Sequence, residues 1–373
     1  MEGAYGGIPP SSAARDLVRS IVASLRMSRE SRPWRRHLRG IVDHVSRATL
    51  QLSRFERRMR RRPTLLMYHR ILPQAQCGNY PFPALVMPED AFEEQVAWLA
   101  RHAEVVTATD ASQRIMSRRE STGRPVVAIT FDDGYADNFT IAAPILERHG
   151  VHGTFYLASD FVGADRLLWY DHAALLVAGS ADELLRLSAA SCGIGPPSAQ
   201  DLAASRVAAW VELLKRTAPA ARSHWIATVE AASPPVNRDN YRAMRPEEAA
   251  GLARRGHEIG SHSVAHEILP LLDDDALAFE LNHSREVIAE WVGDQVPGFC
   301  YPNGSCDERV VAATRAAGYD YACTTNSPHG DPMDDVLLLG RVDLNHTRVS
   351  RPSGRFDLVA FRAEICGLHD RMR

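Results

Sequence analysis

Short apolar runs and longer amphipathic stretches alternate along most of the chain. The apolar runs are rich in β-branched and aromatic residues and end at polar or glycine-containing positions, which is the pattern of buried strands. The predicted strands lie at 64–69, 104–107, 126–131, 153–157, 258–262, 296–301, 319–324 and 336–344. Between them, apolar residues recur at helical spacing, and the predicted helices lie at 88–99, 111–116, 138–149, 245–256, 273–293, 307–317 and 357–366. Because strands and helices alternate, the sequence predicts an α/β domain with parallel strands.

The interval 159–244 departs from this rhythm. It is rich in alanine and leucine, contains several helical segments, and is interrupted by the pairs Pro196-Pro197 and Pro234-Pro235. We interpret it as a helical subdomain inserted into the α/β domain, over the carboxyl ends of the strands. The α/β domain as a whole is predicted to span 63–373.

The first 62 residues form a separate, basic extension. Residues 1–63 contain 15 arginines, no lysine and five acidic residues, which gives a net charge of +10. Because the whole chain has a net charge of −3, residues 64–373 have a net charge of −13. Apolar residues at helical spacing predict basic helices over 11–62. Two interpretations stay open: peripheral contact with a membrane or another polyanion, or a solvated extension that packs on the domain or on a partner chain. Aromatic residues are few in this segment, which argues against nucleic-acid binding.

Three features of the sequence bear on the compartment. No apolar run reaches the roughly 18 residues that a membrane-spanning helix needs. Residues 1–10 lack the basic-then-apolar pattern of a signal peptide. The six cysteines are scattered without CxxC spacing, which is typical of reduced thiols. We therefore expect a cytoplasmic protein, with peripheral attachment at the inner face of the membrane as the alternative role of the basic extension.

Candidate chemistry gathers at the ends of two predicted strands. The strand at 126–131 runs into Asp132-Asp133-Gly134, and the strand at 258–262 runs into His262-Ser263-Val264-Ala265-His266. Two histidines four residues apart share one face of a helical turn, so we expect His262 and His266 on such a turn. Two imidazoles and one carboxylate form a metal site with positions left open for water and substrate. Asp133 is the expected carboxylate ligand, which leaves Asp132 as a general base.

Three segments carry a resemblance to a known family. They are Thr130-Phe131-Asp132-Asp133-Gly134, the run from Gly256 to His266, and Phe299-Cys300-Tyr301-Pro302-Asn303-Gly304. In this order they resemble the first three motifs of the polysaccharide deacetylase (NodB-homology) family, and the resemblance covers roughly 64–158 and 245–345. It implies a distorted (β/α) barrel of about seven strands. It also implies a divalent metal, usually zinc, and the removal of acetyl groups from N-acetylated sugars.

The resemblance assigns roles residue by residue. Asp133, His262 and His266 would bind the metal, and Asp132 would be the general base. Zn2+ is the expected ion, and Co2+, Ni2+ or Fe2+ fits the same ligands. The backbone N–H of Asn303 would donate a hydrogen bond to the oxyanion. We also expect Tyr135, Tyr301 and Pro302 to lie on the substrate side of the site.

The third motif departs from the family pattern. The family has an arginine before the first proline of this turn, where it steadies the base, but here Cys300 and Tyr301 occupy those two positions. The turn is instead similar to the Tyr-Pro-Asn-Gly type of bacterial exopolysaccharide deacetylases. Arg341, in Gly340-Arg341-Val342-Asp343, resembles a recurrent arginine of that subgroup, and we expect it to pair with an active-site carboxylate.

A general acid must protonate the leaving amine, and three histidines are candidates. Leu344-Asn345-His346 matches the Leu-x-His motif of the family, and Leu368-His369-Asp370 also looks like it. His69 ends the first predicted strand in a Tyr-His pair, which resembles a permuted subgroup with its acid histidine near the N-terminus. Because the barrel needs one more strand than the segment after Leu344 offers, we favour His69 over His346 and His369.

Together these features predict a metal-dependent hydrolase that removes the N-acetyl group of an N-acetylhexosamine in a bacterial polysaccharide or saccharide precursor, releasing acetate. The partner is then an N-acetylated glycan or sugar. One alternative keeps the chemistry but acts on a lipid-linked sugar or small molecule, by deacetylation or deformylation. Another alternative is a catalytically inactive barrel that binds glycans.

Overall fold

The computed structural model describes residues 62–118, 123–327, 335–351 and 355–367. Contacts divide the chain into two units, Met1–Gln51 and Leu52–Arg373, and the described residues all belong to the second. The predicted basic helices of the N-terminal extension, and His369, lie outside the described residues.

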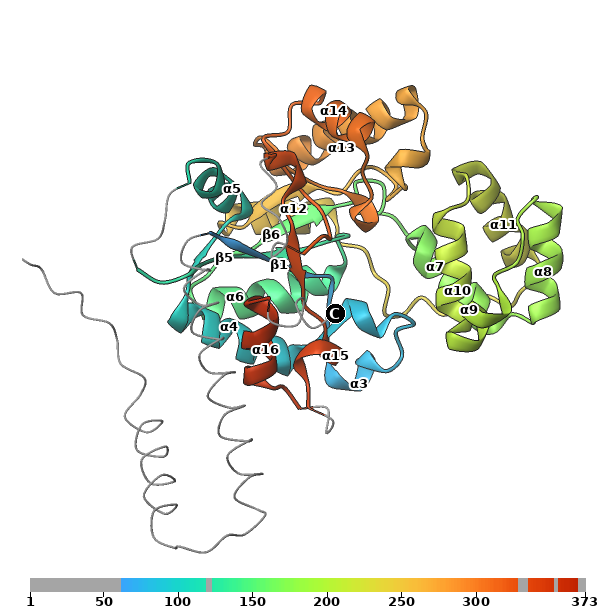
Figure 1. Ribbon diagram of the computed structural model, residues 1–373, viewed down its shortest axis with the longest axis horizontal. Helices are drawn as coiled ribbons and strands as arrows, with labels where there is room; N and C mark the ends of the chain where they lie inside the picture. Colours follow the sequence, from blue (N-terminus) through green and yellow to red (C-terminus); the bar gives the residue numbers. More distant parts are fainter. Residues whose placement is uncertain (1–61, 119–122, 328–334, 352–354, 368–373) are drawn as a thin grey trace, which may run out of the picture. The chain divides into compact units, whose positions relative to one another are not determined.

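The barrel is a parallel sheet that includes β5, the strand that leads into the two adjacent aspartates. Its strands are β1 (Thr64–Tyr68), β4 (Glu104–Val106), β5 (Val126–Phe131), β6 (Thr154–Leu157), β7 (Glu258–Ser261), β8 (Gly298–Cys300), β9 (Tyr321–Cys323) and β10 (Arg341–Asp343). The order is β10-β1-β5-β6-β7-β8-β9, and β4 pairs with the first half of β5. A parallel bridge between Cys323 and Leu339 nearly closes β9 onto the segment before β10. The predicted distorted (β/α) barrel is therefore confirmed, with β1 between β5 and β10 (Figure 1).

Helices flank this sheet. They are α3 (Gln74–Cys77), α4 (Glu89–His102), α5 (Ala108–Met116), α6 (Ala143–Arg148), α12 (Pro246–Arg254), α13 (Asp274–Val292), α14 (Glu308–Ala316), α15 (His346–Val349) and α16 (Leu358–Ile365). Among these described helices, all but the four-residue helices α3 and α15 lie at positions that the apolar spacing predicts. In α4, Phe92, Val96 and Leu99 are fully buried and form its inner face. A short parallel pair, β2 (Arg70–Leu72) with β3 (Val86–Pro88), lies between β1 and α4 in the chain.

The ends of α13 show how local sequence sets an element. The Asp273 side chain accepts a hydrogen bond from the Ala276 N–H and caps the helix. Gly293 adopts a left-handed conformation (φ 68°) just after the last helical residue, which a glycine does without steric cost. Both predicted ends of this helix are confirmed.

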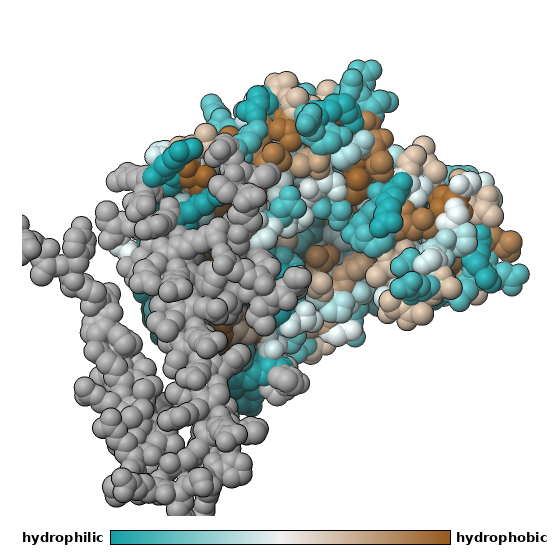
Figure 2. Space-filling view, in the orientation of Figure 1, coloured by the Kyte–Doolittle hydropathy of each residue, from teal (hydrophilic) through white to brown (hydrophobic). Residues whose placement is uncertain are grey.

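Five helices occupy the interval that the sequence analysis separates from the barrel. They are α7 (Trp169–Gly179), α8 (Asp182–Ser191), α9 (Ala199–Ala204), α10 (Arg206–Lys215) and α11 (Pro219–Ala231). These helices have a hydrophobic core of their own, in which the rings of Trp210 and Trp225 stack with centroids 5.3 Å apart. On the face that Figure 2 shows, apolar side chains gather around a hollow next to this helical group.

Two predicted elements differ in detail. The predicted strand at 336–344 is a 3-10 turn, Val336–Leu338, followed by the short strand β10, because the Asp335 carboxylate accepts from the Leu337 N–H and favours the turn. The predicted helix at 138–149 begins as a π-helical turn, Asn138–Ala142, before α6. Pro144 has no N–H to donate to the preceding turn, which accounts for the altered geometry. None of the described helices has both the length and the apolarity that crossing a membrane requires.

Candidate active site

Asp132 and Asp133 follow directly after β5, and both carboxylates turn into the same region. Side chains on a strand normally alternate between faces. Here Asp133 has φ 81° and Gly134 has φ 95°, so the chain leaves the extended conformation at once. Both aspartates are almost fully buried, with 2% and 1% of their surfaces exposed. Two buried carboxylates need cationic or metal partners, because unpaired buried charge is costly.

The two histidines lie on a loop, so the predicted helical turn is wrong. Ser263 has φ 67° and His266 has φ 58°, values that an α-helix does not contain. The loop is held by the buried Glu280 carboxylate of α13, which accepts hydrogen bonds from two successive backbone N–H groups of the loop, at 2.8 and 3.1 Å. This contact, rather than helical spacing, brings His262 and His266 together.

Asp133, His262 and His266 form one compact group, which is called the metal group below. The Nε2 atoms of His262 and His266 lie 3.5 and 3.4 Å from Oδ1 of Asp133. His262 Nδ1 lies 2.7 Å from the Cys300 carbonyl oxygen, so Nδ1 carries a proton and Nε2 is the atom left to bind a metal. Ligand atoms at about 2.0–2.2 Å around a tetrahedral ion are roughly 3.3–3.6 Å apart. The spacing and donor set therefore fit a divalent metal such as zinc.

The charge states of Asp133 and His266 suit a metal. Burial alone would raise the pKa of Asp133, but the neighbouring histidines lower it far below its usual range, so the carboxylate is ionised. Burial lowers the pKa of His266 to about 3, so its imidazole is neutral. Burial also favours neutral His262, but the carboxylates of Asp133 and Asp132 raise its pKa. Ionised carboxylates and neutral imidazoles are the forms that bind metals.

A second group of potential ligands contains Asp132, His262 and Cys300, but it suits a metal less well. Burial raises the pKa of the Cys300 thiol well above its usual value, which keeps it protonated, whereas a metal binds the thiolate. The Arg341 guanidinium also lies 2.9 Å from the Cys300 sulfur. A cation at this position disfavours a second cation.

Asp132 is paired with Arg341, the first residue of β10. Two guanidinium nitrogens donate to the two carboxylate oxygens, each at 2.7 Å, and Arg341 is 1% exposed. The same side chain donates to Thr130 Oγ1 and to the Thr324 carbonyl oxygen, at 3.0 and 3.1 Å. Burial raises the pKa of Asp132, but the Arg341 charge more than offsets this and holds the pKa below its usual range. The cation missing at Cys300 is thus supplied from another strand.

Of the two candidate general acids that the structure describes, His69 and His346, it brings His69 to the aspartates. His69 follows β1, and its Nε2 lies 3.9 Å from Oδ2 of Asp132, with 15% of its side chain exposed. His346 begins α15 instead, where its Nδ1 lies 2.7 Å from the Ser350 hydroxyl.

These groups open into a cavity of about 260 Å3. Its polar lining residues are His69, Asp132, Asp133, Glu212, Lys215, His262, His266, Asn303 and Thr325, and its other lining residues are Phe82, Ala84, Leu85, Tyr170, Ala208 and Val211. A second cavity of about 410 Å3 shares His69, Ala84, Leu85, Asn303 and Thr325 with the first, and is lined beyond them by Asp343, Arg348 and Glu364. The shared residues make the two cavities halves of one cleft. The half at α10 is mainly apolar but also contains the Glu212–Lys215 ion pair, and the half at α15 and α16 is charged.

Three residues predicted for the substrate side lie elsewhere. Tyr135 and Tyr301 are fully buried, Pro302 is also buried, and none of them is among the described residues that line the cleft. The Tyr135 hydroxyl donates to the Asp171 carboxylate, and Tyr301 packs edge-on against Phe299 with ring centroids 5.3 Å apart. Asn303, which has φ 57°, does line both halves of the cleft.

Two contacts of this site were not predicted from the sequence. The Tyr170 hydroxyl donates to Oδ2 of Asp133 at 2.8 Å, and Glu280 holds the histidine loop. Glu280 had a detectable signal, since an acid lies there on the same helical face as Leu277 and Leu281. Tyr170 had none, because an aromatic residue at a helix start is usually part of the core.

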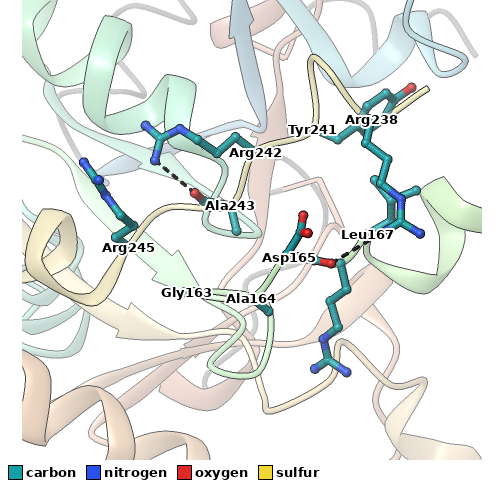
Figure 3. Close-up of a pocket in the computed structure, with 10 residues that line it drawn as sticks. Gly163, Ala164, Asp165, Leu167, Arg238, Tyr241, Arg242, Ala243 and Arg245 are labelled. Atoms are coloured by element: carbon teal, nitrogen blue, oxygen red, sulfur yellow. Dashed lines mark hydrogen bonds between the residues drawn. The ribbon is translucent and has the colours of Figure 1, made fainter. Parts of the chain in front are cut away.

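A larger cavity, of about 550 Å3, lies apart from these residues. Its lining includes Arg166, Arg238, Arg242 and Arg245, and none of the candidate metal ligands or catalytic residues. Figure 3 shows the side chains of Arg242 and Arg245 on one side of this cavity and that of Arg238 on the other, so the three do not converge on a common centre. Arg242 and Arg245 share the Glu248 carboxylate, at 2.8 and 3.1 Å. The smaller cleft is therefore the candidate active site.

Solved structures similar to this chain share its fold. BC0361, a polysaccharide deacetylase from Bacillus cereus, matches with a TM-score of 0.51 and 18% identity, over 81% of this chain and 68% of that one. IcaB from Ammonifex degensii matches with a TM-score of 0.50 and 16% identity, over 81% of this chain and 97% of that one. At these identities the similarity establishes the architecture alone.

Sequence comparison is more specific. The YxkH protein of Bacillus subtilis, whose name places it among polysaccharide deacetylases, is 29% identical over 99 residues, which are 26% of this chain and 33% of YxkH. The match thus spans about a third of the length of that curated relative. The family model described as "Polysaccharide deacetylase" matches residues 119–322, more than half of the chain, including both aspartates and both histidines. This chain belongs to the polysaccharide deacetylase family.

Proposed function

We propose that this protein is a metal-dependent hydrolase that removes the acetyl group from an N-acetylhexosamine of a bacterial polysaccharide or saccharide precursor. Water and the amide become acetate and a free amine. The observation that carries the proposal is the cleft in which the Asp133, His262 and His266 group lies beside the Asp132–Arg341 pair.

In this proposal Asp133, His262 and His266 hold the divalent ion. Zinc is the expected ion for two imidazoles and a carboxylate, and Co2+, Ni2+ or Fe2+ fits the same donors. When bound, the ion would polarise the amide carbonyl and make the attacking water more acidic.

The protein's own residues divide the proton transfers. Asp132, kept ionised and oriented by Arg341, accepts a proton from the attacking water. The backbone N–H of Asn303, at the edge of the cleft, donates to the oxygen that gains negative charge. His69 then donates a proton to the leaving nitrogen. Its Nε2 lies 3.9 Å from Oδ2 of Asp132, so acid and base lie side by side in the cleft and can act on the same amide.

The direct test is a screen for acetate release. Metal-loaded protein is incubated with N-acetylglucosamine oligomers, lipid-linked N-acetylated sugars and small N-acetyl amides, with and without a chelator. We expect release from at least one sugar substrate, loss of release after chelation, and recovery when zinc is added back. Zinc-loaded, folded protein that releases no acetate from any substrate would instead support the inactive glycan-binding alternative.

The apolar half of the cleft favours a second candidate substrate. Phe82, Leu85 and Val211 line the cleft together with the Glu212–Lys215 ion pair, and apolar surface of this kind suits a substrate with an apolar part next to the sugar. A lipid-linked sugar or an apolar glycoside has this character. In the same screen, a lipid-linked N-acetylated sugar with a higher kcat/KM than the free oligomers would identify this class.

Replacing His69 with alanine is expected to lower kcat by about 100- to 10,000-fold, because proton donation to the leaving amine is lost. Zinc content and KM should change little, since His69 is not in the metal group. The matched control is His346→Ala, which we expect to retain kcat within about twofold because His346 lies away from the cleft lining. Loss of activity in His346→Ala with retention in His69→Ala would reverse the assignment.

Replacing Ala208 with tryptophan is expected to lower kcat/KM by about tenfold or more, because the indole would fill part of the apolar half of the cleft. Ala208 lines this half and its side chain is exposed, so the fold tolerates the change. Ala204→Trp, at an exposed position at the end of α9, is the control and should leave kcat/KM unchanged. Equal activity of the two variants would remove α10 from the substrate site.

A further inference from the structure

Two adjacent residues at the start of α7 hold two different members of the metal group. The Tyr170 hydroxyl donates to Oδ2 of Asp133 at 2.8 Å, and the Trp169 indole N–H donates to the His266 carbonyl oxygen at 2.8 Å. Neither residue lies on a strand of the barrel. Both belong to the helical insert, so the insert is attached to the metal group at two points.

The contact with Tyr170 means that the two carboxylate oxygens of Asp133 have different partners. Oδ1 faces the Nε2 atoms of His262 and His266, while Oδ2 accepts from Tyr170. A carboxylate that is hydrogen-bonded through one oxygen presents the other to a metal, and it is no longer free to rotate. Tyr170 therefore selects which oxygen of Asp133 is available.

Tyr170 is itself fixed by buried neighbours. Its hydroxyl oxygen packs 3.1 Å from that of Tyr135, whose single proton is donated to the Asp171 carboxylate. Tyr80 donates to the other oxygen of Asp171 at 2.8 Å. All four residues are at most 6% exposed, so water does not compete for these bonds.

Trp169 is held in a similar way on the other side. The Arg222 guanidinium carbon lies 4.2 Å from the centre of a Trp169 ring, and Arg222, which is 1% exposed, pairs with Glu267. Glu267 directly follows His266 in the chain. Helix α11 thus supports the same contact that α7 makes with the histidine loop.

We propose that Trp169 and Tyr170 are positioning residues through which the helical insert orders the metal group, with Tyr170 directing Oδ1 of Asp133 towards the ion. The inference rests on the metal-dependent function proposed above. Groups that orient metal ligands typically contribute about 10- to 100-fold to metal affinity. The insert is then part of the metal site as well as a wall of the substrate cleft.

The test is the zinc affinity of Tyr170→Phe in the full chain. Protein stripped with a chelator is titrated with zinc in competition with a chromophoric chelator, and the visible spectrum is recorded after loading with cobalt. We expect the dissociation constant for zinc to rise about 10- to 100-fold and the cobalt spectrum to change. The control is Tyr241→Phe, the same chemical change at a buried tyrosine whose hydroxyl has no hydrogen-bond partner among the described residues. It should match the parent.

The outcomes separate this inference from the proposed function. Parent and Tyr170→Phe binding zinc equally tightly, with identical cobalt spectra, overturns the inference alone. A parent protein that binds no divalent ion overturns both. If the metal-free Tyr170→Phe variant unfolds at a lower temperature than the parent, Trp169→Phe carries the test, because it keeps an aromatic ring against Arg222 and removes the N–H donor. Weaker zinc binding in that variant supports the inference, and unchanged binding overturns it.

Discussion

Zinc binding and acetate release are both expected to be lost when His262 is replaced by alanine. The variant removes one of the three proposed ligands and leaves only Asp133 and His266, whose ligand atoms lie close together. Two ligands hold a divalent ion far more weakly than three, so the purified variant should contain less than about a tenth of one zinc per chain. Metal content by atomic emission and acetate release on the best substrate of the screen are the measurements.

The control for this variant is His283→Ala. His283 is an exposed histidine of α13, stacked on Phe279 with ring centroids 4.8 Å apart, and it is not part of the metal group. It should retain both zinc and activity. Asp133→Asn should behave like His262→Ala, because an amide is a poor substitute for the ionised ligand. Stoichiometric zinc and full activity in His262→Ala would place the metal elsewhere.

Much of the fold was predictable because its signals are local. The cap at Asp273, the stop at Gly293 and the buried face of α4 each depend on residues within a few positions of one another. The paired aspartates also follow a strong strand pattern. The sequence alone therefore predicts β5, the acids at its end and the histidines after β7.

The errors and omissions arise from contacts that are distant in the chain. The spacing of His262 and His266 suggested a helix, but Glu280, on a helix that begins after the loop, stabilises a loop with two left-handed residues. Tyr170 reaches Asp133 across 37 positions, and its local sequence resembles that of any helix start packed in a core. Such contacts depend on how the insert meets the barrel, which local periodicity does not encode.

Arg341 is another residue whose partner is distant in the chain. Its resemblance to a recurrent arginine suggested a carboxylate partner, but not which one, because 209 positions separate it from Asp132. The departure at Cys300 is explained by this arrangement. The small thiol leaves room for the Arg341 guanidinium, which lies 2.9 Å from the sulfur and binds the carboxylate that an arginine at position 300 would otherwise pair with.

Replacing Arg341 with methionine is expected to inactivate the enzyme and to destabilise the fold. The change leaves the Asp132 carboxylate buried without its cation, and breaking a buried pair in this way costs about 3–5 kcal/mol of unfolding free energy. Burial then raises the pKa of Asp132 with nothing from Arg341 to offset it, so the base is protonated over more of the pH range. Since general-base catalysis contributes about 100- to 10,000-fold, kcat should fall by a factor in that range.

The Asp132–Arg341 pair also makes stability and activity depend on pH in a predictable direction. In the parent, the pKa of Asp132 is lower in the folded than in the unfolded protein, so the pair stabilises the fold above the ordinary carboxyl pKa, and this is lost as pH falls through the lowered value. In Arg341→Met the acid limb of the kcat/KM profile should move to higher pH.

Arg341→Lys keeps the charge but not the two-pronged geometry and should be intermediate. Arg315→Met breaks an exposed pair with Asp335 and should cost less than about 1 kcal/mol. An unshifted acid limb in Arg341→Met would show that Arg341 does not set the protonation of Asp132.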